Sequence, residues 1–301
     1  MKPAIEVIVN AGSGSVLGDE TARSLRERFI AFGMKTNVHL AGSGAEIVRL
    51  ARHAEEGDAE LIVVGGGDGT ISTVAASAMR SGKTLGILPL GTLNNFSKDL
   101  EIPQNLNAAV RVVAQGVVKE IDVAEVNGRI FINNSSIGLY PKMVVRRDQQ
   151  QQKIGRGKWT AAFWASLRLF QISPFLIVDI ELDGKVFERK TPFVFVGNNE
   201  YQMDMYNIGR RPSLEEGTLS LYYLHRQGRW GLVMLMWKTV SGGLKQWKDF
   251  EAVTTEHVTI NSKRSRLRVA FDGETSVLRP PLEYRIRPKA LKVIVPLPSN
   301  A

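Results

Sequence analysis

The chain has 301 residues, of which 44% are hydrophobic and 23% charged, so it can bury a sizeable core and is expected to form two domains. The longest apolar run, residues 230–237, falls well short of the ~20 residues that a membrane-spanning helix needs, which argues against an integral membrane protein. The absence of cysteine excludes disulfides, thiolate zinc sites and a cysteine nucleophile. The formal net charge of +9 favours anionic partners, whether nucleic acid, an anionic membrane surface or a phosphate-bearing substrate.

The histidines and the first residues of the chain argue against two further classes, histidine-based metalloenzymes and secreted proteins. The four histidines are far apart, with no His-x-x-x-His pair, so a catalytic metal site built from histidine is not expected. The first nine residues carry one lysine and an early glutamate, Glu6, which favours a first strand over a secretory signal. We therefore expect a cytoplasmic protein.

The first third of the chain alternates apolar strands with amphipathic helices. Strands are expected at residues 5–9, 37–40, 61–64 and 84–88, and helices at residues 19–32, from 44 past Ala54, and at 70–81. Small-residue loops beginning at Asn10, Gly65 and Gly91 follow three of these strands. This pattern predicts a doubly wound α/β sheet, and in such sheets ligands bind at the carboxyl ends of the strands.

From about Val117 onward the sequence reads as mostly β. Asn127-Gly128, Asp183-Gly184 and Asp272-Gly273 each separate two apolar or alternating runs and predict tight hairpins. Together with a run at residues 193–196, these strands are enough for a β-sandwich. Amphipathic or apolar helices are expected at residues 159–170 and 230–240, and a polar segment begins at Arg146.

Residues 65–70, with the sequence Gly-Gly-Gly-Asp-Gly-Thr, form the most informative stretch. Glycines let the backbone turn sharply and approach an anion closely, and the first N–H groups of the following helix point toward negative charge. The carboxylate of Asp68 would repel a phosphate unless a cation lay between them or the acid took part in proton transfer. Its presence therefore suggests Mg²⁺-nucleotide chemistry. The competing interpretation is a plain strand-to-helix turn with Asp68 as the helix N-cap.

Several other motifs are missing, which narrows the chemistry. Gly82-Lys83-Thr84 lacks the first glycine of a Walker loop, and neither Gly12-x-Gly14 nor Gly65-x-Gly67 continues as a dinucleotide fingerprint. The chain also lacks a Gly-x-Ser-x-Gly elbow and a protein-kinase catalytic loop. Standard Rossmann dehydrogenases, α/β-hydrolases and protein kinases are therefore not indicated.

Three segments taken together resemble a known family: residues 65–70, then Pro89-Leu90-Gly91-Thr92 followed by Asn94-Asn95-Phe96, and finally Phe271-Asp272-Gly273-Glu274. The chain resembles the diacylglycerol kinase catalytic-domain superfamily of bacterial lipid kinases, sphingosine kinases and ceramide kinases over nearly its whole length. The resemblance implies an N-terminal α/β nucleotide domain similar to that of NAD kinase and phosphofructokinase, at residues 1–120, with residues 288–301 as a candidate completion. A C-terminal β-sandwich would occupy residues 121–287, with the active site in the cleft between the two.

The resemblance also implies roles for individual residues. Glu274 matches the general base that takes the proton from the lipid hydroxyl, and Asp68 is expected to help hold Mg²⁺. Without the family, Glu274 would be interpreted as the exit residue of a hairpin. The nucleotide-binding positions are Asn10, Ala11, Gly12, Ser13, Gly14, Gly66, Gly67, Asp68, Gly69, Thr70, Ile71, Ser72 and Thr92. A structural Mg²⁺ site falls on Ser213, Glu216 and Thr218.

The sequence departs from the family at several of these places. Ala11 stands where the family commonly has proline, and Ala41 offers no hydroxyl where a threonine is frequent. Asn95 replaces the aspartate of an Asn-Asp-Phe-Ala-Arg motif, which removes one substrate or metal contact. Glu216 replaces an aspartate of an Asp-Asp-Gly turn, so the carboxylate there is one methylene longer.

We expect an ATP- and Mg²⁺-dependent lipid kinase that phosphorylates the hydroxyl of a neutral lipid, diacylglycerol-like or ceramide-like, within lipid metabolism and phospholipid biosynthesis. It would bind ATP, a membrane lipid and the anionic inner face of the membrane, but no nucleic acid. The alternatives are a soluble-substrate kinase of the NAD kinase type and a non-catalytic nucleotide-sensing or nucleic-acid-binding protein. The exposed basic residues expected at the membrane are Lys263, Arg264, Arg266 and Arg268, although a solvated strand face would explain any one of them.

Overall fold

The structure is a computed structural model that describes residues 5–13, 18–138, 175–201, 211–224 and 250–298. The helices expected at residues 159–170 and 230–240, the polar segment from Arg146 and the predicted nucleotide contact Gly14 lie outside these residues. Within the described part of the chain, no helix is long and apolar enough to span a membrane.

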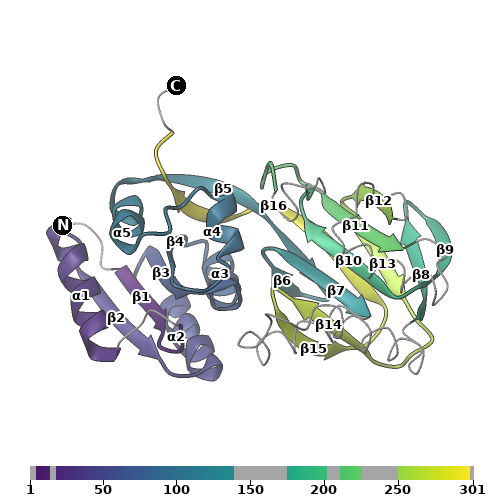
Figure 1. Ribbon diagram of the computed structural model, residues 1–301, viewed down its shortest axis with the longest axis horizontal. Coiled ribbons are helices and arrows are strands. Elements are labelled where there is room, and N and C mark those ends of the chain that lie inside the picture. Colours follow the sequence, from purple (N-terminus) through teal and green to yellow (C-terminus); the bar gives the residue numbers. More distant parts are fainter. Residues whose placement is uncertain (1–4, 14–17, 139–174, 202–210, 225–249, 299–301) are drawn as a thin grey trace, which may run out of the picture.

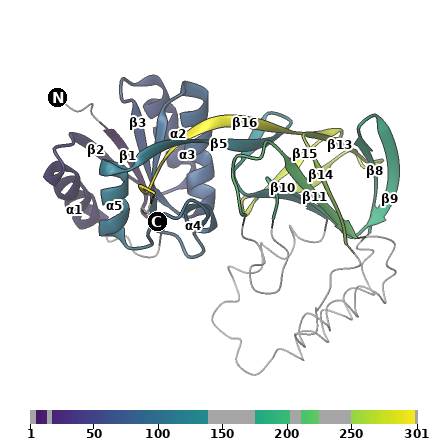
Figure 2. The same ribbon diagram turned by 90° about the horizontal axis from the view of Figure 1, so that it is seen from above.

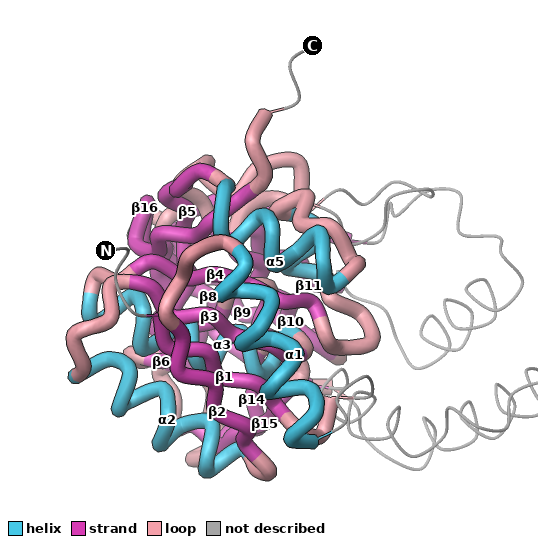
Figure 3. Tube along the Cα trace, turned by 90° about the vertical axis from the view of Figure 1, so that its left-hand side faces the viewer, coloured by secondary structure: helices cyan, strands magenta, loops and turns pink. Residues whose placement is uncertain are grey.

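Four parallel strands form the N-terminal part of the sheet, in the spatial order β2-β1-β3-β4. They are β1 (Ile5–Asn10), β2 (Thr36–Ala41), β3 (Leu61–Gly66) and β4 (Thr84–Pro89). The helices are α1 (Gly18–Ala31), α2 (Gly44–Glu56), α3 (Asp68–Ser81), α4 (Asn95–Asp99) and α5 (Leu106–Gln115). Helices α1 and α5 cover one face of these strands and α2 and α3 the other (Figures 2 and 3). The predicted doubly wound α/β arrangement is confirmed.

The predicted apolar faces of the helices are the faces that pack on this sheet. Ile47, Leu50 and Ala54 of α2 are buried, as their three- and four-residue spacing predicts. Ser43 caps α2 by accepting a hydrogen bond from the backbone N–H of Glu46 at 3.2 Å. Helix α3 ends at Gly82, whose φ of 68° is the left-handed conformation that glycine adopts without strain.

Helices α4 and α5 were not predicted, although α5 carries a clear signal. Its buried residues Ala109, Val110 and Val113 have helical spacing, and Asn105 caps it by accepting N–H bonds from Asn107 and Ala108. Five residues are too few to show a period, so the sequence pattern of α4 is uninformative.

The C-terminal half is a sandwich of strands, with the second layer a six-stranded sheet in the order β12-β11-β10-β7-β14-β15. Its strands are β7 (Asn134–Gly138), β10 (Phe193–Asn198), β11 (Leu219–Leu224), β12 (Phe250–Thr255), β14 (Leu267–Phe271) and β15 (Glu274–Leu278). The facing strands belong to the ten-stranded sheet and are β5 (Val117–Val126), β6 (Arg129–Phe131), β8 (Leu176–Leu182), β9 (Lys185–Thr191), β13 (His257–Asn261) and β16 (Leu282–Val295). The predicted β-sandwich is confirmed.

The three hairpins predicted from Asn-Gly and Asp-Gly pairs are all present. In each, the two turn residues have positive φ, with 47° and 77° at Asn127-Gly128, 49° and 73° at Asp183-Gly184, and 45° and 92° at Asp272-Gly273. Two consecutive positive φ values match the right-handed twist of the flanking strands, which explains why these residue pairs mark the turns. The last of these hairpins places Glu274 directly opposite Phe271.

Strands β5 and β16 run through both halves of the molecule (Figure 1). They pair antiparallel with each other from end to end, with an irregularity between Arg287 and Leu291, and β16 also pairs parallel with β4 through Val293 and Leu85. One ten-stranded mixed sheet therefore continues from the α/β half into the sandwich, while each half keeps its own apolar core. The predicted boundaries at residues 120, 121 and 288 stay a prediction.

Candidate active site

The glycine turn between β3 and α3 packs against the turn after β4, and glycine is required in both. A Cβ added at Gly66 would lie 2.7 Å from the Cβ of Thr70, and one added at Gly91 would lie 2.3 Å from the Cα of Gly67. Because real Cβ atoms do not approach other atoms so closely, a side chain at Gly66 would clash with the first turn of α3, and one at Gly91 would push the two turns apart. Two of the three small-residue loops predicted at this edge therefore meet backbone to backbone.

The N-terminus of α3 is open. Gly67 is its N-cap and offers no side-chain hydrogen bond, so the first N–H groups of this 14-residue helix have no cap. These N–H groups and the helix dipole favour an anion at this end. The interpretation of Asp68 as the cap of α3 is wrong, because Asp68 is the first residue of the helix.

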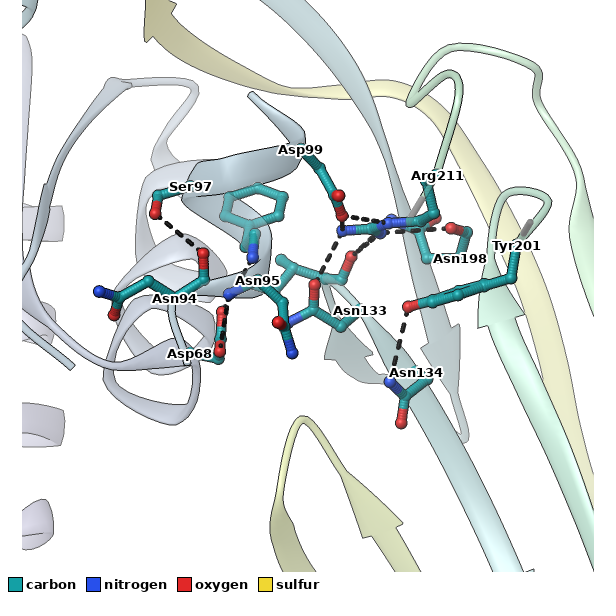
Figure 4. Close-up of polar contacts among 12 residues, drawn as sticks. Asp68, Asn94, Asn95, Ser97, Asp99, Asn133, Asn134, Asn198, Tyr201 and Arg211 are labelled. Carbon is teal, nitrogen blue, oxygen red and sulfur yellow. Dashed lines mark hydrogen bonds and ion pairs between the residues drawn. The ribbon is translucent and has the colours of Figure 1, made fainter. Parts of the chain in front are cut away.

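Asp68 instead caps α4, a different helix (Figure 4). Its carboxylate accepts the backbone N–H of Asn95 at 3.2 Å and that of Phe96 at 3.0 Å. Asn94, the N-cap residue of α4, has a left-handed backbone with φ 51° and provides no side-chain cap of its own. Asp68 thus supplies the missing cap, and its half-buried position leaves part of the carboxylate accessible.

The first predicted nucleotide loop is tied to α3. Asn10 donates from Nδ2 to the Thr70 hydroxyl at 3.0 Å and accepts the Gly12 N–H on Oδ1 at 2.9 Å. The N–H of Ser13 donates to the Asn10 carbonyl, and that of Ala11 to the Ala41 carbonyl. The structure therefore brings Asn10 and Thr70 together. The amides of Gly12 and Ser13 bond within the loop, and that of Ala11 bonds to strand β2.

Three further predicted positions differ in their access to a ligand. Ile71 is fully buried in the core and its N–H donates to the Gly67 carbonyl, so its side chain is not available to a nucleotide. Thr92 is exposed on the turn after β4. Ser72 is half-buried on α3 and lies beside Asp272 and Glu274 at the boundary with the sandwich.

Glu274, the predicted base, lies directly against the glycine segment although the two are about 200 residues apart in the chain. A Cβ added at Gly69 would lie 3.3 Å from Oε1 of Glu274. Glu274 is the first residue of β15 and its side chain is exposed. The two halves of the chain therefore meet where the sequence motifs predicted that they would.

Asp272 holds this corner of the sandwich together. Its carboxylate accepts the backbone N–H groups of residues 132, 133 and 134 at 2.9, 2.8 and 3.1 Å. Burial raises the pKa of the Asp272 carboxyl, while the nearby Ser72 hydroxyl and these hydrogen bonds oppose the shift. The turn that presents Glu274 is thus anchored on a buried acid.

A pocket of about 310 Å³ opens between the two halves beside Glu274. Helices α2 and α3 line one side, and the β5–β6 and β14–β15 turns line the other. Its walls carry Arg52, Arg80 and Arg129. Arg80 is paired with Glu55 at 2.7 Å, and Arg129 donates to the Ser276 hydroxyl at 2.8 Å.

The residues expected to form a structural Mg²⁺ site are partly engaged in hydrogen bonds within the protein. Glu216 is exposed, the Ser213 hydroxyl accepts the N–H of Glu215 at 3.1 Å, and the Thr218 carbonyl accepts the N–H of Asn199 at 2.9 Å. The described residues contain no group of three or more acids or histidines placed to hold a metal. No catalytic step is assigned to a metal at this loop.

The acid that organises this loop is Asp122, which was not predicted. It is 1% exposed, and its two oxygens accept the N–H of Gly217 at 2.6 Å and of Lys289 at 2.9 Å. An acid inside the apolar run Ile121-Asp122-Val123 is a signal that the sequence did offer. A carboxylate that holds two backbone amides explains how the loop keeps its shape among protein groups alone.

Arg211 and Asp99 were also missed. They form an ion pair at 2.8 Å whose side chains are 0% and 5% exposed, and Figure 4 shows the pair between α4 and the sandwich. Burial raises the pKa of the Asp99 carboxyl and the nearby guanidinium of Arg211 opposes this shift. Neither residue belongs to a motif, and the partners are 112 residues apart, so no local pattern could find them.

Comparisons with known proteins match both halves. Residues 4–126 match the Diacylglycerol kinase catalytic domain, and residues 136–295 match the YegS C-terminal NAD kinase beta sandwich-like domain. The chain belongs to the diacylglycerol kinase family. It is a lipid kinase, as the resemblance in its sequence predicted.

Individual relatives are distant but cover nearly the whole chain. A diacylglycerol kinase of Bacillus subtilis is 25% identical over 269 residues, which are 87% of this chain and 84% of that protein. A diacylglycerol kinase of Staphylococcus haemolyticus is 23% identical over 280 residues, covering 91% and 83%. The crystal structure of a diacylglycerol kinase from Bacillus anthracis superimposes with a TM-score of 0.68 at 23% identity and covers 97% of both chains, which confirms the fold.

Proposed function

We propose that this lipid kinase transfers the γ-phosphoryl group of ATP to the hydroxyl of a neutral lipid, diacylglycerol-like or ceramide-like, with Glu274 as the general base. The observation that carries the proposal is the contact between Glu274 and Gly69, where a Cβ would lie 3.3 Å from the carboxylate. An acceptor hydroxyl bound at Glu274 would then stand beside the segment that binds the transferred phosphate.

The open N-terminus of α3 is the proposed phosphate site. Its uncapped N–H groups, together with the glycine contact between Gly67 and Gly91, provide a cradle in which phosphate oxygens can approach the backbone. Asn10 and Thr70 border this cradle through their mutual hydrogen bond. Phosphoryl transfer depends on such positioning and on neutralising the charge of the phosphate oxygens.

Asp68 is the residue that would hold a divalent cation, proposed to be Mg²⁺. An ionised carboxylate has about four acceptor sites, and Asp68 uses two for Asn95 and Phe96. The half-buried side chain therefore retains the capacity to bind a cation that arrives with the nucleotide. Such an ion would neutralise charge on the phosphate oxygens.

A membrane surface is the proposed source of the lipid. Lys263, Arg264, Arg266 and Arg268 are all exposed, at and beside the start of β14, and β14 leads directly into the turn before Glu274. Basic residues near an anionic membrane contribute about 1 kcal/mol each to binding. This cluster would bring the Glu274 side of the molecule toward the bilayer.

The lipid substrate is tested with γ-labelled ATP and mixed lipid vesicles containing diacylglycerol or ceramide, with NAD added in parallel. Label that moves into the organic phase supports the proposal, and mass analysis of the product identifies the lipid. Label that moves into a water-soluble product would point to a kinase of the NAD kinase type. Omission of Mg²⁺ is expected to abolish transfer, and full transfer without a divalent cation would remove Asp68 from its proposed role.

The base is tested with the Glu274→Gln variant, which keeps the size of the side chain and removes its charge. We expect an unchanged nucleotide Kd and a fall in kcat of ~10²–10⁴-fold. Glu283→Gln is the matched control, because the carboxylate of Glu283 on β16 is exposed and its ion pair is with exposed Arg285, at 3.1 Å. Full turnover by the Glu274 variant would exclude the base role.

A further inference from the structure

Arg211 is a buried cation at the junction of the two halves of the molecule. Its Nε and Nη2 atoms both lie 2.8 Å from Oδ2 of Asp99, the last residue of α4. The two side chains are 0% and 5% exposed, so this pair has lost nearly all contact with water. A buried ion pair must be completed by further hydrogen bonds to offset its desolvation.

The other hydrogen bonds of Arg211 go to the sandwich. Nη2 donates to Oδ1 of Asn133 at 2.8 Å, and Nη1 donates to the carbonyl of Ile132 at 2.5 Å. The guanidinium carbon also lies 5.9 Å from the ring centroid of Phe96 and 5.5 Å from that of Tyr201. Arg211 therefore binds α4 with one edge and the connection between β6 and β7 with the other.

That same connection is held from its N–H side by Asp272. The carboxylate of Asp272 accepts three consecutive N–H groups of residues 132–134 at 2.8 to 3.1 Å. Residues 132–134 thus lie between a guanidinium that binds their oxygen atoms and a carboxylate that binds their N–H groups. Because the two charges polarise the same peptide groups, each strengthens the binding of the other.

The contacts form a series that begins and ends at α3. The series runs from Asp68 to the N-terminus of α4, and from Asp99 to Arg211. It continues through residues 132–134 to Asp272, whose carbonyl oxygen lies 3.8 Å from the position of a Cβ added at Gly69 of α3. The same added Cβ would lie 3.3 Å from Oε1 of Glu274.

We propose that Arg211 is a positioning residue for phosphoryl transfer. Through Asp99 and residues 132–134 it fixes the turn that carries Glu274 at its distance from the phosphate segment of α3. The inference rests on the proposed role of Glu274 as the base. Arg211 itself does not contact the proposed substrates, because it is buried behind α4 and the β6–β7 connection.

The test is the Arg211→Lys variant. A single ammonium group keeps the charge but cannot bind Asp99 and the β6–β7 connection together in the way of the planar guanidinium. We expect kcat to fall about 10- to 100-fold, because displacements of an ångström can cost this much, with the KM and Kd for ATP unchanged. Arg287→Lys is the matched control, because Arg287 is itself exposed and pairs with Glu125 at 2.9 Å. The kcat of this variant should equal that of the unchanged protein.

A double-mutant comparison separates positioning from a general loss of structure. If Arg211 acts through Glu274, adding Arg211→Lys to Glu274→Gln should not lower the residual rate further. A full additional 10- to 100-fold loss in that background would overturn the inference, as would an unchanged kcat in the single variant. An active Glu274→Gln enzyme would instead refute the proposed base, so the two failures are distinguishable.

A milder variant keeps the inference testable if Arg211→Lys does not fold. Asn133→Ala leaves the ion pair intact and removes only the 2.8 Å hydrogen bond to Arg211. We expect a fall in kcat of about 5-fold, again absent in the Glu274→Gln background. An unchanged kcat in a folded Asn133→Ala protein would contradict the inference.

Discussion

Asp68 and Asp272 stand on opposite halves of the molecule, and each carboxylate binds the backbone N–H groups of a distant segment. Asp68 accepts two, from Asn95 and Phe96, and Asp272 accepts three, from residues 132–134. They differ in burial, because Asp68 is half-buried whereas Asp272 is 9% exposed. The difference indicates that Asp68 can serve both the fold and a ligand, while Asp272 serves the fold alone.

Gly69 and Glu274 lie between these two acids. The acid of each motif therefore supports the residue beside it: Asp68 holds the turn before Gly69, and Asp272 holds the turn before Glu274. A catalytic contact between two domains needs such support on both sides, because neither an exposed glutamate nor a glycine turn can hold its own position. Changes at the two acids should accordingly have unequal effects on stability.

The largest effect is expected from Asp272→Asn. The amide retains one acceptor oxygen and turns an NH₂ group toward buried N–H donors, so we expect a loss of about 3 kcal/mol in the free energy of unfolding. Urea unfolding followed by circular dichroism measures it. Asp183→Asn is the control, because Asp183 occupies the same position of an exposed Asp-Gly hairpin and should change stability by less than about 0.5 kcal/mol. Equal losses in the two variants would show that the loss of stability comes from the hairpin turn and not from the burial of the acid.

A smaller loss of stability is expected from Asp68→Asn. The variant weakens a half-exposed cap of α4, which corresponds to about 1 kcal/mol in the free energy of unfolding. Asp58→Asn, at an exposed acid between α2 and β3, is the control and should be neutral. If Asp68→Asn destabilised the protein as strongly as Asp272→Asn, the distinction between the two acids would be lost.

A third effect concerns Tyr201 beside Arg211, and it appears only in alkaline solution, so it is absent at neutral pH. Burial raises the pKa of Tyr201 from 10.0 to about 12. The folded protein then holds a proton that the unfolded chain loses near pH 10, so this contribution to stability is present below pH 10 and is lost between pH 10 and 12. Its limit is about 2.7 kcal/mol.

Urea unfolding of the unchanged protein and of Tyr201→Phe at pH 8 and pH 11 provides the measurement. The two proteins should lose stability to different extents, with the variant losing about 1.4 kcal/mol less between these pH values. Equal losses would indicate that Tyr201 titrates near its usual pKa. That result would also imply that Tyr201, and with it the surroundings of Arg211, is more hydrated than its burial indicates.

Local patterns in the sequence were enough for most of the architecture. The alternation of β1 to β4 with amphipathic helices, and the Asn-Gly and Asp-Gly hairpins, depend on periodicity and on positive φ within a few residues. The meeting of the glycine motif with Glu274 was predicted through the family resemblance, and the two segments do lie in contact. The nucleotide, metal and base roles assigned to individual residues stay predictions.

The sequence by itself determined the strands, the hairpins and the glycine turn, because each is encoded by neighbouring residues. Only the tertiary structure decided what the charged residues do. Asp68 caps a helix 27 residues away, Arg211 pairs with Asp99 across 112 residues, and Asp122 holds Lys289 across 167. A buried charge is satisfied by whichever donors or acceptors the fold brings to it, and those partners leave no period or spacing in the chain.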